Sequence, residues 1–233
     1  MSPGRKLIVN ADDFGLSPGI NRGIIEAHDN GIVTSAGLMI HMPAAAEAAR
    51  LARKRPRLSL GLHIDVGEWR YENGSWLPVY ERAPQNDLKA LEAAVTQQLD
   101  LFRRFVGIDP THLDSHQHVH MQGPLRYIAC ELAAQLDVPL RHFERDVFYR
   151  GDFYGQDEKG RPLAGRLTAS FLAEIIERLD EGVTELGCHP AAKLDFQGTY
   201  YQERLMELEA LCSPDLVKVL ERENVLLVSF SNL

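Results

Sequence analysis

The sequence predicts an α/β fold: a distorted seven-stranded parallel (β/α) barrel that forms a single domain over residues 1–233. Short apolar runs alternate with longer amphipathic segments, which is the pattern of right-handed βαβ units and a parallel sheet. Seven such units suit a closed or nearly closed barrel better than a doubly wound sheet. No glycine-rich phosphate loop follows the first strand, which argues against a dinucleotide-binding fold.

In the first part of the chain, the strands are apolar runs and the helices begin at recognisable residues. Ser17 is suited to be an N-cap, Pro18 to be the first helical residue, and Gly31 to end that helix. Pro43 opens an alanine-rich helix. We expect strands at 7–9, 34–40 and 58–66, and helices at 18–30 and 43–54.

The rest of the chain continues this alternation with two interruptions. Leu91, Val95 and Leu99 lie on one stripe of a long helix that Asp87 begins. The segments 67–86 and 145–161 show no periodicity, and we expect irregular loops there. The expected strands are 111–115, 139–143, 183–188 and 225–230, and the expected helices are 87–105, 125–136, 168–179 and 202–223.

Composition excludes several classes of protein. The chain is 45% hydrophobic and 25% charged, as globular proteins are, and its net charge of -8 makes nucleic acid and anionic membranes poor partners. Cys130, Cys188 and Cys212 are too few and too irregularly spaced for a disulfide framework or a zinc motif. The first nine residues lack the apolar stretch of a signal peptide, and no run approaches the ~18 apolar residues of a membrane span. We expect a cytoplasmic protein, for which a homodimer is compatible with the sequence.

Polar residues gather at the predicted carboxyl ends of four strands, where a β/α barrel carries its functional groups. Asp12 and Asp13 end the first strand, His63 lies near the end of the third, and His189 follows the sixth. The fourth strand and its continuation contribute a longer set: His112, Asp114, His116, His118 and His120. The sequence therefore predicts that carboxylates and imidazoles meet at one rim.

The pair Asp12 and Asp13 indicates a cation or a shared proton, because two adjacent carboxylates that face one pocket repel each other. A single aspartate there would often only cap the following turn. Cys188 beside His189 could be read as a nucleophile, but a cysteine in an apolar strand is more often inert core.

The histidine row favours a metal site. In an extended chain its alternating members would share one face, whereas a bend after Ser115 would make His116 and His120 an i, i+4 pair. A solvated histidine tract is the simpler alternative. His63 alone would suit a core histidine, but it gains weight as a third ligand beside an aspartate and another imidazole. This mixed donor set suits zinc or another first-row ion, since magnesium prefers more oxygen; we expect one divalent ion, Mg²⁺ or Zn²⁺.

Two long motifs carry a family resemblance. Val9-Asn10-Ala11-Asp12-Asp13-Phe14-Gly15-Leu16-Ser17 and Thr111-His112-Leu113-Asp114-Ser115-His116-Gln117-His118-Val119-His120 resemble the signatures of the YdjC/ChbG-type carbohydrate deacetylases. Gly61-Leu62-His63 and Cys188-His189-Pro190 are also similar to that family. The resemblance implies a distorted β/α barrel that removes acetyl groups from N-acetylated amino sugars with a divalent cation.

Position by position, the resemblance implies that Asp12 is the general base and His189 the acid, and that Asp13, His63 and His116 bind the metal. An acetylated sugar would be the substrate, and segments 67–86 and 145–161 would contact it.

Two other interpretations of the sequence stay open. One is another metal-dependent amidohydrolase or phosphoesterase, in which Asp114, His118 and His120 supply ligands for a second ion. The other is a sugar-binding homologue that has lost catalysis.

Overall fold

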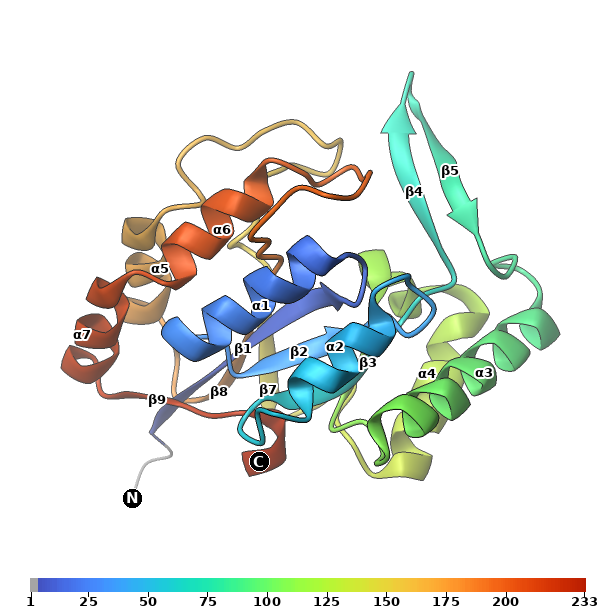
Figure 1. Cartoon of the computed structure of the whole chain (residues 1–233), viewed down its shortest axis with the longest axis horizontal. Helices are drawn as coiled ribbons and strands as arrows, with labels where there is room; N and C mark the ends of the chain where they lie inside the picture. Colours follow the sequence, from blue (N-terminus) through green and yellow to red (C-terminus); the bar gives the residue numbers. More distant parts are fainter. Residues whose placement is uncertain (1–3) are drawn as a thin grey trace.

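The structure, a computed structural model, describes residues 4–233, so the first three residues of the N-terminal stretch lie outside it. It contains a seven-stranded parallel sheet and a separate two-stranded hairpin (Figure 1). The sheet has the order β6-β3-β2-β1-β8-β7, and β9 also pairs with β1. The sheet strands are β1 (Arg5–Phe14), β2 (Ser35–Leu38), β3 (Ser59–Ile64), β6 (Leu113–Ser115), β7 (Val147–Arg150), β8 (Gly182–Cys188) and β9 (Val225–Leu227).

Strand β1 is the centre of the sheet. Its apolar residues 7–9 are fully buried, as expected for a parallel strand that is covered on both faces. One edge pairs with β8 from Arg5 to Ala11, and the other edge is shared by β9 at its beginning and β2 from Asn10 onward. The register with β2 shifts between Ala11 and Phe14, so Asp12 and Asp13 occupy an irregular end of the central strand.

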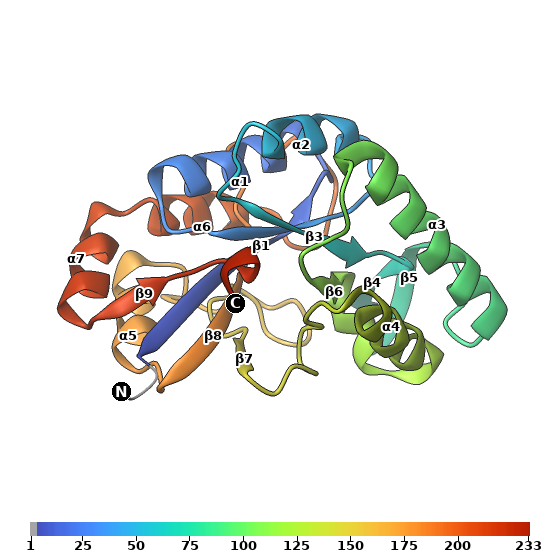
Figure 2. The same ribbon diagram turned by 90° about the horizontal axis from the view of Figure 1, so that it is seen from below.

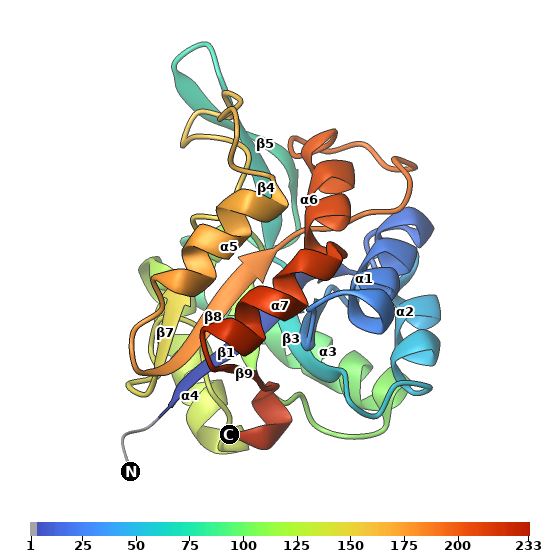
Figure 3. The same cartoon turned by 90° about the vertical axis from the view of Figure 1, so that its left-hand side faces the viewer.

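Helices pack along the outer side of the sheet, which curls as Figure 2 shows. Ser17 caps α1 as predicted, because its Oγ accepts the N–H of Ile20 at 3.1 Å. Figure 3 shows α5, α6 and α7 against the β8 and β9 side. The helices are α1 (Pro18–Asn30), α2 (Ala45–Ala52), α3 (Leu88–Val106), α4 (Gly123–Leu136), α5 (Ala169–Glu177), α6 (Glu203–Leu211) and α7 (Pro214–Arg222), with short 3₁₀ turns η1 (His116–Met121) and η2 (Phe230–Asn232). None of the helices in the described part of the chain has both the length and the apolar character needed to cross a bilayer.

The predicted α/β class and distorted barrel are confirmed. Within residues 4–233, β6 and β7 do not pair with each other, so the parallel sheet is a curled, open barrel. Apolar side chains from distant parts of the chain, among them Phe14, Leu62, Phe102 and Leu186, form one core between the sheet and its helices.

The strand predicted at 139–143 is wrong. Only Leu140 forms a bridge, to Leu113, and His142 adopts a left-handed backbone with φ 69° that ends any extended run. The corresponding sheet strand is β7, which lies in the segment 145–161 that was expected to be irregular. Apolar content favoured a strand at 139–143, but the turn at His142 was not visible in the residue types.

The expectation of an irregular loop at 67–86 is also wrong. Strands β4 (Gly67–Glu72) and β5 (Ser75–Glu81) form an antiparallel hairpin that projects from the body (Figure 1). Its turn residues Asn73 and Gly74 have φ of 51° and 87°, as a type I′ turn requires. The Asn-Gly pair was therefore a hairpin signal. The helix expected at 202–223 is divided into α6 and α7 just before Pro214, which begins the second of them.

Candidate metal centre

The five predicted site residues come together at the carboxyl edge of the sheet. Asp13 Oδ1 lies 2.9 Å from His116 Nδ1 and 3.4 Å from His63 Nε2. Asp12 Oδ2 lies 3.8 Å from His189 Nε2. Strands β1, β3 and β8 and the turn η1 thus deliver these groups to one place, because the carboxyl ends of parallel strands share an edge.

Asp13, His63 and His116 fit a divalent ion. One ligand atom from each lies within 4.8 Å of the others, and all three residues form a buried group. Nε2 of His63, the ring nitrogen on the side of Asp13, is buried without a hydrogen-bond partner, and such an atom needs an explanation in a native fold. A bound cation would supply that partner, and two imidazoles with one carboxylate are a donor set of catalytic metal sites.

The carboxylates around His116 and His63 favour the protonated form of both imidazoles. Burial alone would lower the pKa of His116, but the Asp13 carboxylate outweighs it and raises that pKa to about 9. Burial would also lower the pKa of His63, but the Asp114 carboxylate outweighs burial and raises that pKa well above its ordinary value. A metal that binds these imidazoles must displace such protons.

The turn η1 decides between the two arrangements left open for the histidine row. Gln117 and His118 have left-handed φ of 52° and 54°, so the chain bends sharply after His116. His120 does not join His116: its Nδ1 lies 2.6 Å from Ser115 Oγ and its Nε2 lies 3.0 Å from the carbonyl oxygen of Arg141.

The two remaining histidines of the row, His118 and His112, make their contacts away from the candidate metal ligands. Nδ1 of His118 lies 3.0 Å from Nε2 of His142. His112 is buried and stacks on Phe230 at a ring distance of 3.9 Å, and burial lowers its pKa to about 4. Cys188 is fully buried, which raises the pKa of its thiol well above the ordinary value and fits inert core rather than a nucleophile.

Asp12 is held by Arg141, a residue that the sequence did not single out. Nη1 of Arg141 donates to Asp12 Oδ2 at 2.7 Å, and Nη2 donates to Oδ1 at 2.8 Å. Asn10 Nδ2 adds a second donor to Oδ1 at 3.0 Å. Burial would raise the pKa of Asp12, but the guanidinium prevails and holds it below its usual range.

Arg141 also joins two further buried carboxylates. It lies 2.9 Å from Asp114 Oδ2 and 2.7 Å from Glu185 Oε1. Asp114 in turn contacts His63, with Oδ1 2.9 Å from His63 Nδ1. Because Nδ1 of His63 is engaged in this way, its Nε2 is the nitrogen that faces Asp13.

His189 lies between Asp12 and α6. Its backbone N–H donates to a carboxylate oxygen of Glu207, whose other oxygen accepts the hydroxyl of Tyr200. Its side-chain Nδ1 is buried, lacks a hydrogen-bond partner and lies 3.8 Å from Glu207 Oε1. Nε2 is the ring nitrogen on the side of Asp12.

The hairpin borders the site on another side. Oε2 of Glu68 in β4 lies 3.8 Å from His116 Nε2, and its Oε1 accepts the hydroxyl of Thr199 at 3.3 Å. The side-chain amide of Gln117 makes two hydrogen bonds to the backbone of Trp69, of 2.7 and 2.9 Å. Segment 67–86 therefore contacts the candidate metal centre.

Sequence reasoning missed Arg141, Arg204, Glu207 and Glu68. Arg141 lies in segment 139–143, which was wrongly predicted as a strand. An arginine within a predicted buried strand was the available signal, because such a charge needs a partner. Arg204 and Glu207 are three residues apart, which places them on one face of α6, and both are buried. Charged residues on a helix are usually solvated, so this spacing did not distinguish them.

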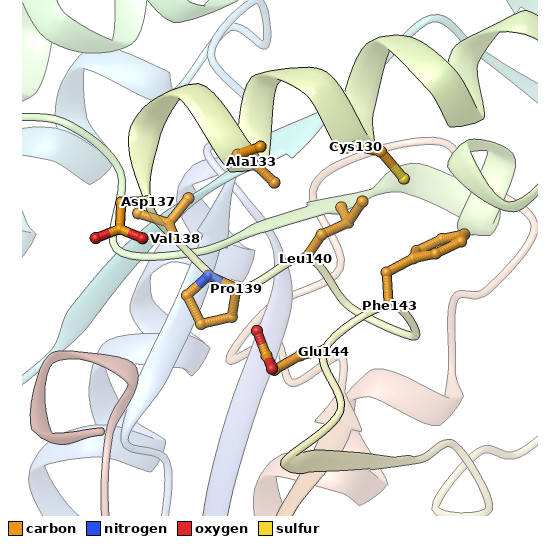
Figure 4. A pocket seen from close by; sticks show the side chains of 9 residues that line it. Cys130, Ala133, Asp137, Val138, Pro139, Leu140, Phe143 and Glu144 are labelled. Carbon is orange, nitrogen blue, oxygen red and sulfur yellow. The ribbon is translucent and has the colours of Figure 1, made fainter.

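A surface pocket of about 580 Å³ lies between α4 and the following segment (Figure 4). Cys130, Leu140 and Phe143 are part of its lining, which contains none of the five candidate site residues. It is therefore separate from the candidate metal centre.

The chain is similar to known proteins in sequence and in fold. Residues 6–222 match the model of the YdjC-like protein family. The chain is 37% identical to a carbohydrate deacetylase of Geobacillus stearothermophilus (97% of both chains) and 35% identical to a chitooligosaccharide deacetylase of Serratia marcescens (97% of this chain, 98% of that protein). The structure of a putative cellobiose-phosphate cleavage protein from Enterococcus faecalis is similar, with TM-score 0.79, 27% identity and 98% of both chains covered. A family 4 carbohydrate esterase from Streptomyces lividans shares the fold, with TM-score 0.56, 13% identity and coverage of 97% of this chain and 92% of that one.

Proposed function

The chain belongs to the YdjC-like family, and we propose that it is a metal-dependent carbohydrate deacetylase that hydrolyses the acetamide of an N-acetylated amino sugar. One observation carries the proposal. The three candidate metal ligands adjoin a carboxylate and an imidazole, Asp12 and His189, that lie 3.8 Å apart. Amide hydrolysis needs this set, because the attacking water must lose a proton and the departing amine must gain one.

Asp13, His63 and His116 would hold the ion, Mg²⁺ or Zn²⁺, which when bound would polarise the acetyl carbonyl and acidify the attacking water. Asp12 accepts the proton of that water. Its Oδ1 already accepts two hydrogen bonds, whereas Oδ2 accepts only Arg141 among the described residues and keeps a lone pair free. As the water oxygen bonds to the acetyl carbon, its proton therefore passes to Oδ2.

His189 completes the reaction on the leaving-group side. The C–N bond breaks with its electron pair on nitrogen, and Nε2 of His189 donates a proton there, which yields acetate and the free amine. Glu207 holds the backbone of His189 and faces its Nδ1, so the ring presents Nε2 toward Asp12.

The surroundings of the cluster favour this reaction over a two-ion phosphoesterase. A second ion would need ligands from Asp114, His118 or His120. Both oxygens of Asp114 are engaged, by His63 and by Arg141 and Asn10, and both nitrogens of His120 are hydrogen-bonded. One ion per chain is the expected stoichiometry.

Acetate release tests the proposal. Metal-stripped protein is supplied with Mg²⁺, Zn²⁺, Mn²⁺ or Co²⁺ and incubated with N-acetylated mono- and oligosaccharides. We expect acetate only with metal. His189→Ala should slow acetamides far more than matched acetyl esters, because an alkoxide leaves more easily than an unprotonated amine. Protein that binds metal but releases acetate from none of these sugars would refute the function.

A further inference from the structure

Arg204, at the beginning of α6, contacts one of the two carboxylate oxygens of Asp13 and leaves the other to the imidazoles. The arginine is only 3% exposed, and its Nη2 donates to Asp13 Oδ2. The other oxygen, Oδ1, faces His116 at 2.9 Å and His63 at 3.4 Å. One oxygen is thus directed to the candidate metal position and the other is occupied by a guanidinium.

The guanidinium is fixed independently of Asp13. Its Nε donates to the carbonyl oxygen of Tyr200 at 3.0 Å, and its Nη1 donates to that of His189 at 3.4 Å. The rings of Phe196 and Tyr200 lie 5.2 and 5.6 Å from its central carbon. Because these contacts hold the guanidinium in place, it forms a fixed hydrogen-bond donor for Oδ2 of Asp13.

We propose that Arg204 is a positioning residue that restricts Asp13 to one-oxygen coordination and so keeps a position on the ion open for reactants. The inference rests on the proposed function. Aspartate can bind a cation through one or both oxygens, and a catalytic site needs an unfilled position. The positive charge of Arg204 also weakens the attraction of Asp13 for a cation. Asp13, His63 and His116 would therefore bind the metal more tightly if Arg204 were absent. With Arg204 present, the affinity is lower and one position on the ion stays open.

Metal titration tests this inference without any sugar. Arg204→Met should bind Mn²⁺ at least about tenfold more tightly than the wild type in calorimetry of metal-stripped protein, because a repelling charge is removed. Water-proton relaxation should show fewer exchangeable waters on the bound Mn²⁺, since the second oxygen takes a position. Arg204→Lys, which keeps the charge, should stay near the wild-type affinity.

The matched control is Arg55→Met, which removes an arginine that pairs with Asp29 and contacts none of the candidate site residues. It should change neither readout. Weaker Mn²⁺ binding by Arg204→Met, or an unchanged number of waters, would overturn the inference. If Arg204→Met does not fold, Arg204→Gln carries the same two measurements with the same expectations. Absence of acetate release by the wild type would refute the deacetylase function and leave these metal readouts interpretable.

Discussion

Asp12 and Asp13 are adjacent, chemically identical and both buried, yet their surroundings differ. Arg141 engages both oxygens of Asp12, whereas Arg204 engages one oxygen of Asp13 and leaves the other to two imidazoles. Burial would raise both pKa values; the arginines overcome it, and that of Asp13 is held well below its usual range with the help of His116. The two aspartates therefore differ in which carboxylate oxygens keep a free lone pair, and the roles proposed for them follow from that difference and not from the residue type.

The backbone makes the difference possible. Neighbouring side chains of a regular strand point to opposite faces. Asp13 instead has a left-handed φ of 66°, a conformation that costs a non-glycine residue about 1–3 kcal/mol. This turn lets both carboxylates contribute to the same site while they face different partners.

The largest expected effects, on turnover and on metal content, come from replacing the carboxylate of each aspartate with an amide. Asp12→Asn should retain metal and lose about 10²–10⁴-fold in turnover, since an amide cannot accept the water's proton. Asp13→Asn should lose metal in the same assay. Metal content and kcat are measured on both. Lost metal in Asp12→Asn together with retained metal in Asp13→Asn would reverse the two roles.

Arg141→Met should remove the support of Asp12 and destabilise the fold. Three buried carboxylates, Asp12, Asp114 and Glu185, would lose their common partner, and such a loss typically costs about 3–5 kcal/mol. Urea unfolding of metal-free protein measures it, with Arg55→Met as the surface control. A loss below about 1 kcal/mol, as at an exposed pair, would contradict the electrostatic role.

Asp114→Asn should affect the surroundings of both aspartates, through His63 on the side of Asp13 and through Arg141 on the side of Asp12. Asp114 orients His63 through Nδ1 and also contacts Arg141. Removing such a partner of a ligand lowers metal affinity about 10–100-fold. Titration with Zn²⁺ checks this, and an affinity equal to the wild type would show that packing alone orients His63.

The pH dependence of metal affinity tests the Asp13 side of the site without any substitution. The pKa of His116 in the metal-free protein is about 9 because the Asp13 carboxylate outweighs burial. Affinity should therefore fall as pH decreases below 9, by about tenfold per unit for each displaced proton, and level off above it. Calorimetry in buffers of different ionisation enthalpy counts the protons released.

His118 supplies the control for that measurement. Burial lowers its pKa to about 3, so it carries no proton between pH 6 and 9. His118→Gln should keep the wild-type slope. A pH-independent affinity in the wild type would mean that His116 is not a ligand.

The sequence alone determined the fold class and singled out the five candidate site residues that lie together at one edge of the sheet. Alternating apolar runs and helices require a parallel sheet, and the ends of parallel strands share an edge, so Asp12, Asp13, His63 and His189 had to approach one another. It also contained, in Asn73-Gly74, a hairpin signal that the expected loop at 67–86 overlooked. These features depend on local chemistry or on strand order.

Only the tertiary structure decided how the site is tuned. Arg141 lies 129 residues from Asp12 in sequence, and Arg204 lies 191 residues from Asp13. Their residue types suit a solvated surface equally well, and no local pattern specifies which carboxylate oxygen each meets. That choice depends on the packing of α6 and the segment after α4 against the sheet, where burial makes each unpaired charge costly and each pairing specific.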